Sequence, residues 1–162
     1  RGNADDLDGQ IDALVVRLSK LPLKELVSFQ DHFNRRAAEA YRAGLWGAAS
    51  LINGGCSDDG FDDFIGWVIS RGEKVFRAAL ADPDSLARVV GDGNVECADL
   101  GAAAALVYRE STGKDDFYDL LPRLLPTKLE GDLRSWSGND RGLDQAKCRK
   151  LYPRLFKKFC ET

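Results

Sequence analysis

The sequence predicts an all-α protein, a single compact domain of about seven to nine helices with no significant sheet. Apolar residues recur at every third or fourth position through most of the 162 residues, the spacing of one helix face. No window shows the strict alternation of a half-buried strand. Glycines, prolines and capping residues interrupt this rhythm often, so the helices are expected to be short. A chain of this length can bury roughly 70% of its unfolded surface, so residues 1–162 are expected to form one domain.

The first two predicted helices lie before residue 44. An apolar stripe marks the first helix over residues 7–18. The second begins after Pro22, which suits a first helical turn, and Gly44 is its expected stop. The apolar face of this second helix contains Leu26, Phe29, Phe33, Ala37, Ala40 and Tyr41.

The next two helices flank a glycine-rich bend. A short helix over residues 45–52 is predicted to end in Asn53-Gly54-Gly55, because glycine readily adopts the left-handed conformation that closes a helix. Three residues can cap the helix that follows: Ser57, Asp58 and Asp59. Acidic residues at this position also suit the positive end of the helix dipole, and the helix is expected to close near Gly72.

Residues 73–113 contain three more predicted helices. The first covers residues 73–80, and a short one starts at Asp82–Ser85 with Pro83 just inside it. A loop over residues 91–94 leads to a helix of small residues, which can pack closely against a neighbour and which Gly113 ends.

The C-terminal part is the least regular. Helix breakers recur there, at Pro122, Pro126, Gly131 and Gly138, and residues 127–142 are expected to form an irregular connection. The C-terminal helix that follows is expected to be kinked or restarted at Pro153. At the other end, the chain does not begin with methionine, which leaves open that residues 1–4 are partly derived from a vector.

The charge is distributed unevenly along the chain. From residue 128 onward, nine Lys and Arg residues and five Asp and Glu residues give a net charge of +4. The first 127 residues contain 14 Lys and Arg residues and 21 Asp and Glu residues, which give a net charge of −7. An acidic body argues against general nucleic-acid binding, which needs a broad positive surface. No apolar run approaches the ~20 residues of a membrane span, and no signal peptide is evident. We therefore expect a cytoplasmic protein without nucleic-acid or membrane partners.

The four cysteines do not have the spacing of a metal site. They are Cys56, Cys97, Cys148 and Cys160, and no two of them form a CxxC pair, so no zinc site is expected. In a cytoplasmic protein with a sufficient core they are expected to be free thiols. Neither a metal nor another cofactor is predicted.

The stretch from Trp46 to Trp67 is the strongest candidate for a functional site. Its 22 residues contain two of the three tryptophans, five glycines, four aspartates and one cysteine. Such a density of glycines indicates a sharp bend or a close approach of the backbone to another group. The candidate ligand-binding residues are Asn53, Cys56, Ser57, Asp58, Asp59, Trp46, Trp67 and His32.

The four aspartates of this stretch allow two interpretations. Asp58 and Asp62 lie one helical turn apart, as do Asp59 and Asp63, so the pairs could hold a hard cation through their carboxylates. The spacing does not match an EF-hand. In the second interpretation, which we favour, the first two aspartates cap the helix and the other two are solvated.

Two further alternatives concern Cys56 and the tryptophans. A thiolate at Cys56 could be stabilised by the following helix, and a Cys-His enzyme would then need the single histidine, His32, as its base. A buried structural thiol is the alternative. Trp46 and Trp67 could form the floor of a pocket, although aromatic residues at helical spacing belong more often to a core.

A set of residues carries a resemblance to a known family: Leu45–Phe61, Phe64, Trp67, Gly72 and Ala79–Leu86, with flanking patterns at Phe29–Phe33, Tyr41 and Leu151–Phe156. They resemble a bacterial family, often seen in actinobacteria, that is catalogued as a domain of unknown function. The resemblance spans nearly the whole chain, is most specific over residues 53–61, and is lost around Trp136–Arg141. It implies a cytosolic, mostly helical bacterial protein and supplies no activity.

The leading hypothesis from the sequence is a non-enzymatic module that binds a protein or a small ligand at the Asn53–Asp63 loop. The rival is an enzyme that uses Cys56 with His32, or the four carboxylates with or without a metal. A third interpretation makes the loop purely structural. The burial of the aspartates distinguishes a recognition site from a purely structural loop, because a recognition site needs its aspartates exposed to solvent.

Overall fold

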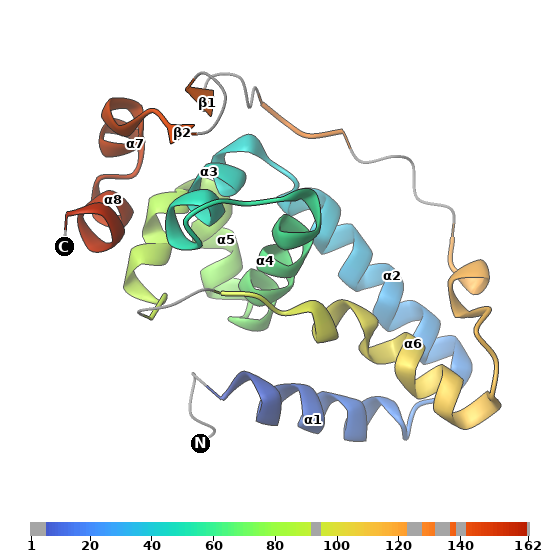
Figure 1. The fold of residues 1–162 in the computed structure, drawn as a ribbon. Coiled ribbons are helices and arrows are strands. Elements are labelled where there is room, and N and C mark those ends of the chain that lie inside the picture. Colours follow the sequence, from blue (N-terminus) through green and yellow to red (C-terminus); the bar gives the residue numbers. More distant parts are fainter. Residues whose placement is uncertain (1–5, 92–94, 123–127, 132–136, 139–141, 162) are drawn as a thin grey trace.

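The computed structural model confirms an all-α architecture (Figure 1). It describes residues 6–91, 95–122, 128–131, 137–138 and 142–161. The described helices and strands are α1 (Leu7–Leu18), α2 (Leu23–Ala40), α3 (Ala43–Ile52), α4 (Asp58–Ser70), α5 (Glu73–Ala81), the 3₁₀ helix η1 (Pro83–Arg88), α6 (Ala98–Thr112), the 3₁₀ helix η2 (Phe117–Leu120), β1 (Ser137–Gly138), β2 (Gly142–Leu143), α7 (Gln145–Leu151) and α8 (Pro153–Cys160). The strands form only a two-residue antiparallel ladder, so no significant sheet is present in this part of the chain.

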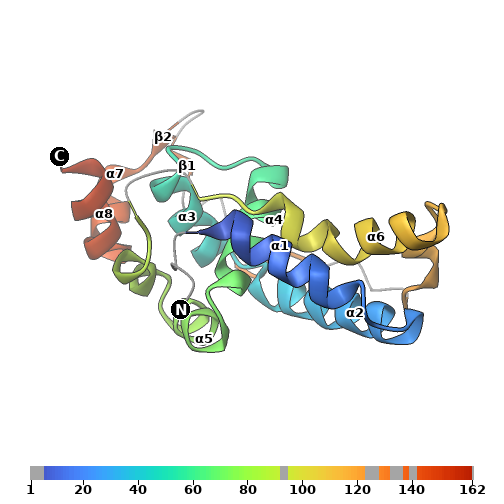
Figure 2. The same cartoon turned by 90° about the horizontal axis from the view of Figure 1, so that it is seen from below.

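The helices pack around two neighbouring hydrophobic clusters. α1, α2 and α6 lie side by side as an elongated arm, and α7 and α8 lie at the opposite end of the molecule beside α3 and η1 (Figures 1 and 2). The larger cluster is formed mainly by α3, α4, η1 and α8, and the smaller one by α1, α2, α6 and η2. α6 joins them, because Leu100 belongs to the larger cluster and Ala103 to the smaller one.

The end of α2 differs from the prediction. Gly44 does not stop this helix: α2 ends at Ala40, and Gly44 lies inside α3. The cause is a distant segment, because the backbone N–H of Glu130 donates to Tyr41 O at 3.1 Å and that of Ala43 donates to Glu130 O at 2.8 Å. This parallel bridge holds Arg42 in an extended conformation between the two helices.

Several predicted boundaries agree with the structure. Gly113 closes α6 in the left-handed conformation, with φ of 71°. The C-terminal helix is restarted rather than kinked at Pro153, since α7 ends at Leu151 and proline occupies the first position of α8. Of the irregular connection over 127–142, only residues 128–131, 137–138 and 142 are described, and residues 1–4 lie outside the described part.

A buried carboxylate attaches α8 to the rest of the fold. Asp84, only 2% exposed, accepts hydrogen bonds from the backbone N–H groups of Arg154 at 3.1 Å and Leu155 at 2.8 Å. The Arg154 guanidinium also donates to Asp84, at 2.7 Å, and pairs with Asp82. A side chain from η1 therefore caps a helix that begins about 70 residues later in the chain.

Candidate functional site

The bend after α3 has the predicted helix-ending geometry. Asn53 ends the helix, and its N–H donates to Ala49 O at 2.9 Å. Gly54 and Gly55 have φ of 68° and 146°, and the Gly55 N–H donates to Ser50 O at 2.9 Å. Side chains other than glycine rarely adopt such positive φ values, so the two glycines are required by the turn itself.

The Asn53 side chain holds a second segment against this bend. Its Oδ1 accepts from the Val95 N–H at 2.9 Å, and its Nδ2 donates to Val95 O at 3.2 Å. These two bonds fix the chain just before α6 beside the end of α3. Asn53 therefore orients the neighbourhood of the loop with both polar groups of its side chain.

Ser57 caps α4, so the favoured interpretation in which Asp58 and Asp59 cap this helix is wrong. Its Oγ accepts a hydrogen bond from the Gly60 N–H at 3.1 Å. Asp58 and Asp59 lie in the first turn with exposed side chains. Their charges suit the helix dipole, and their carboxylates remain accessible to water.

The two tryptophans anchor the bend in the core. Trp46 packs on Phe61 with 4.5 Å between their ring centroids, and Trp67 packs on Phe64 with 5.9 Å between theirs. Trp67 is buried, with the Arg71 guanidinium 5.5 Å from its ring centroid. This arrangement agrees with the core interpretation of the two indoles, which hold the α3–α4 corner rigid.

Cys56 does not have the environment of an activated nucleophile. Burial, together with the charges of Asp58 and Glu96, raises the pKa of its thiol to about 11. Its Sγ lies 3.5 Å from Ser57 O. Burial first, and the negative charges second, therefore keep this thiol protonated, in contrast to the stabilised thiolate that the helix start suggested.

The described contacts of His32 do not bring it to this thiol. His32 is exposed on α2, and its Nδ1 lies 2.7 Å from the backbone oxygen of Ser28 in the preceding turn. The structure thus gives each member of the proposed Cys-His pair a different, local partner. The four cysteines are free thiols.

Six carboxylates gather at the start of α4 and beside the start of α6. They are Asp58, Asp59, Asp62, Asp63, Glu96 and Asp99, and we call them the acidic corner. The corner is brought together by the Cys97 N–H, which donates to Asp63 O at 3.1 Å and holds the α6 segment against α4.

The carboxylates of the acidic corner repel one another. Burial and the charges of the neighbouring aspartates raise the pKa of Asp62, and burial with Glu96, Asp59 and Asp99 raises that of Asp63. Among the residues that the structure describes, none of the six forms a salt bridge, and no group of three or more His, Cys, Asp or Glu is arranged to hold a metal. In the described part of the chain, the corner is therefore a negative surface whose carboxylates form no ion pair.

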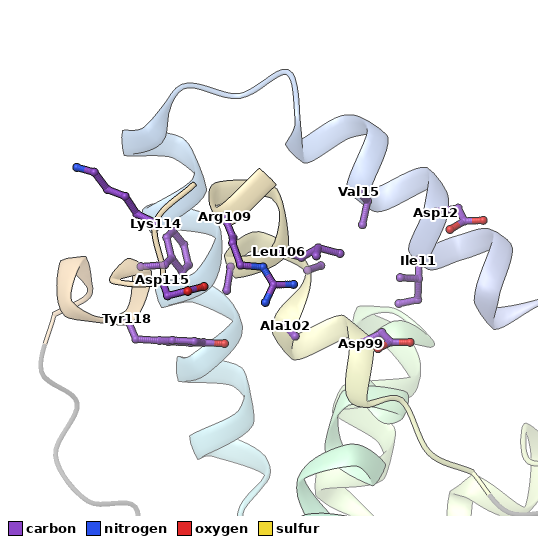
Figure 3. A pocket seen from close by; sticks show the side chains of 13 residues that line it. Ile11, Asp12, Val15, Asp99, Ala102, Leu106, Arg109, Lys114, Asp115 and Tyr118 are labelled. Carbon is purple, nitrogen blue, oxygen red and sulfur yellow. The ribbon is translucent and has the colours of Figure 1, made fainter. Parts of the chain in front are cut away.

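A groove between α1, α6 and η2 was not predicted from the sequence. It encloses about 570 Å³, with Ile11 and Val15 of α1 on one side, Ala102 and Leu106 of α6 along it, and Tyr118 of η2 at one end (Figure 3). The small residues of α6 were the only available signal, because a small side chain leaves space beside a helix. Small residues at helical spacing equally predict close packing against a neighbouring helix, so the sequence alone does not identify a groove.

Fold and site together define an all-helical protein with an exposed acidic corner beside a rigid aromatic core. The chain belongs to the family described as "Protein of unknown function (DUF4240)", whose model matches residues 1–110. The flanking pattern at Leu151–Phe156 lies outside this match, although the resemblance from sequence extended that far. Comparison with curated proteins and with solved structures finds no match.

Proposed function

We propose that this protein is a non-enzymatic binding module of the bacterial cytoplasm, and that its acidic corner holds a cationic segment of a partner protein. The observation that carries the proposal is the set of six neighbouring carboxylates, none of which forms a salt bridge among the residues that the structure describes. A Lys- or Arg-bearing partner would relieve their mutual repulsion on binding.

The surroundings of the corner also suit recognition. Ser57 and Asn53 use their side chains to shape the backbone, which leaves Asp58 and Asp59 exposed on a rigid helix start. A preorganised surface loses little conformational freedom when it binds. No helix in the described part of the chain has the length and apolarity to span a membrane.

The rival enzymatic function has less support. A nucleophilic cysteine requires a lowered pKa or an adjacent base, whereas the pKa of Cys56 is raised to about 11 and His32 is bonded within its own helix. The carboxylates are spread over α4, α6 and the segment before α6, and they repel one another. This arrangement suits a surface for an extended cation better than a compact catalytic pair.

The proposal is tested by titrating the protein with an oligolysine peptide while amide NMR shifts are recorded. We expect the shifts to concentrate at residues 56–63 and 95–99. The double variant Asp58→Asn and Asp59→Asn should weaken binding about threefold to tenfold, since rim charges contribute modestly to affinity and mostly to the association rate.

A matched control uses two other exposed acids in first helical turns, Asp8→Asn and Glu25→Gln. This control has the same net charge and loses the same kind of helix-dipole interaction as the test variant. It should bind the peptide as the wild type does. Equal weakening by both double variants, or shifts spread over every acidic surface, would contradict the proposal.

A further inference from the structure

We infer that the groove between α1, α6 and η2 is a docking site for an amphipathic peptide segment of a partner protein, with an apolar face of about three helical turns and a basic residue at one end. This inference rests on the proposed function, because it extends the same binding surface from the acidic corner through Asp99. It adds the shape and chemistry of the segment that binds.

The shape of the groove follows from one face of α6. Asp99, Ala102, Leu106 and Arg109 are spaced three or four residues apart and line the groove together. Ten residues of helix separate the first from the last, which corresponds to roughly 15 Å. A volume of about 570 Å³ lies in the range that accepts several apolar side chains.

Apolar surface is left uncovered at one end of this groove. Tyr118 lines it and is 56% exposed, and Leu120 of the same short helix is 41% exposed. Phe117, between α6 and these residues, is fully buried and fixes η2 in place. Large apolar groups exposed together beside a groove are typical of an interaction site.

The charges at the two ends of the groove differ. Asp12 and Asp99 lie at one end, and Arg109 and Lys114 lie toward the other, where Asp115 is their neighbour (Figure 3). In the described part of the molecule none of these five residues takes part in a salt bridge. The end with two carboxylates therefore selects a basic residue, and the apolar middle selects the face of an amphipathic helix.

A peptide accounts for these features better than a small molecule does. The charged ends are separated by nearly the full length of the α6 face, so a ligand that meets both must be extended. Asp99 also contributes to the raised pKa of Asp63. The groove and the acidic corner therefore share one electrostatic surface, and a basic partner approaching the corner reaches the groove.

The test is selection of a displayed library of random 16-residue peptides on the full chain. We expect the enriched sequences to share apolar residues at helical spacing and a Lys or Arg at one end. A synthetic peptide of the enriched sequence is then titrated by fluorescence anisotropy. Filling the groove with Ala102→Trp should weaken its binding at least tenfold, and Ala102 is exposed, so the fold should tolerate this change.

Charge exchange tests the orientation of the peptide. The variant Asp12→Lys and Asp99→Lys should weaken binding about tenfold, and a peptide with Glu in place of its basic residue should recover the loss. The control Asp8→Lys and Glu110→Lys makes the same change in charge on the same two helices, outside the groove lining. It should leave the affinity within about twofold of the wild type.

Several results would overturn the inference. These are the absence of enriched peptides, enriched sequences without the apolar spacing or the basic residue, unchanged binding by Ala102→Trp, or no recovery on charge exchange. If selected peptides respond to Asp58→Asn and Asp59→Asn but not to the groove variants, the groove inference fails while the proposed function stands. If Asp58→Asn and Asp59→Asn leave the binding of oligolysine unchanged, the proposed function itself fails.

Discussion

Asp62 shows how a single carboxylate can lie where its charge opposes folding. It follows Asp58 by one helical turn and lies beyond the first turn of α4, where the helix dipole no longer offsets repulsion. Burial and the charges of Asp63, Asp59 and Asp58 raise its pKa. The charge of Asp62 is therefore expected to lower the stability of the folded state.

The first prediction is that Asp62→Asn stabilises the protein at pH 7 by about 0.2–0.5 kcal/mol, the size of one like-charge pair a helical turn apart. A raised pKa means that the folded state binds the proton more tightly than the unfolded state. The unfavourable effect of the charge is therefore absent below the usual Asp pKa of about 3.9 and develops as pH rises through the folded-state pKa. Urea unfolding at pH 7 and pH 4 should show the gain shrinking in acid.

Asp8→Asn is the control for this measurement. Asp8 lies in the first turn of α1, where the dipole favours its charge. Its replacement should lower the free energy of unfolding at pH 7, which is the opposite sign. A loss of stability in Asp62→Asn at pH 7 would contradict the repulsion argument.

The second prediction concerns the reactivity of Cys56. A thiol with a pKa of about 11 is ionised to only about 0.1% at pH 8, whereas an ordinary thiol near pKa 8.5 is ionised to roughly a quarter. We expect iodoacetamide to alkylate Cys56 in the folded chain at least tenfold more slowly than in the urea-unfolded chain. Between pH 8 and pH 10 the rate should rise about tenfold per pH unit. Peptide mass mapping separates Cys56 from the other thiols, and labelling faster than in the unfolded chain would revive the enzymatic alternative.

At the scale of the elements, one side chain of η1 makes most of the polar contacts that hold the start of α8. Asp84 satisfies two backbone N–H groups at the start of α8 as well as the Arg154 guanidinium. Replacing it leaves these donors without their acceptor, whereas replacing Arg154 leaves the two backbone bonds intact. The Asp84 carboxylate is therefore expected to contribute more to the free energy of unfolding than the Arg154 guanidinium does.

The third prediction follows from this asymmetry. Asp84→Ala should lower the free energy of unfolding by about 2–3 kcal/mol, since hydrogen bonds to a charged group contribute about 1.5–3 kcal/mol and the carboxylate is buried. Arg154→Ala should cost about 1 kcal/mol or less, because this side chain is 40% exposed and water can replace it. Urea unfolding of both variants measures the difference. Equal losses would mean that the ion pair, and not the helix cap, holds α8.

The elements also show what the sequence could and could not predict. Local signals were sufficient for the turn at Gly54 and Gly55. They limited the cap of α4 to Ser57, Asp58 or Asp59, and the break at Pro153 to a kink or a restart, because each of these features depends on neighbours within a few residues. The end of α2 was wrong because it is set by Glu130, nearly 90 residues away. The groove could not be predicted for the same reason, because α1, which forms one side of it, lies far in the sequence from α6 and η2.

The candidate site was predictable to a similar degree. The exposed aspartates follow from a polar helix start, so Asp58 and Asp59 lie on the surface as recognition requires. The sequence does not predict that Glu96 and Asp99 join the acidic corner, because their position depends on the hydrogen bonds between Asn53 and Val95. No periodicity in the sequence encodes such a pairing.

At the scale of the whole molecule, the family match and the folded unit have different extents. The family model ends at residue 110, inside α6, but α8 supplies part of the larger core. Tyr152, Leu155 and Phe156 are each at most 4% exposed, and the Tyr152 hydroxyl donates to Gly44 O at 2.6 Å. The C-terminal helices therefore complete a core that the first 110 residues begin.

The fourth prediction is that a chain ending at residue 144, without α7 and α8, loses its cooperative thermal transition. Burying a large apolar side chain contributes about 1.5–3 kcal/mol, so three of them amount to much of the roughly 5–15 kcal/mol that stabilises a typical domain. Truncation also leaves Asp84 as a buried charge without its donors. Circular dichroism melting and dye binding should report a loosely packed helical state, and a synthetic peptide of residues 145–162 should restore the transition. A truncated chain that melts cooperatively near the wild-type temperature would show instead that the core closes without α8, and that the bonds of Asp84 attach a peripheral helix to a domain already complete.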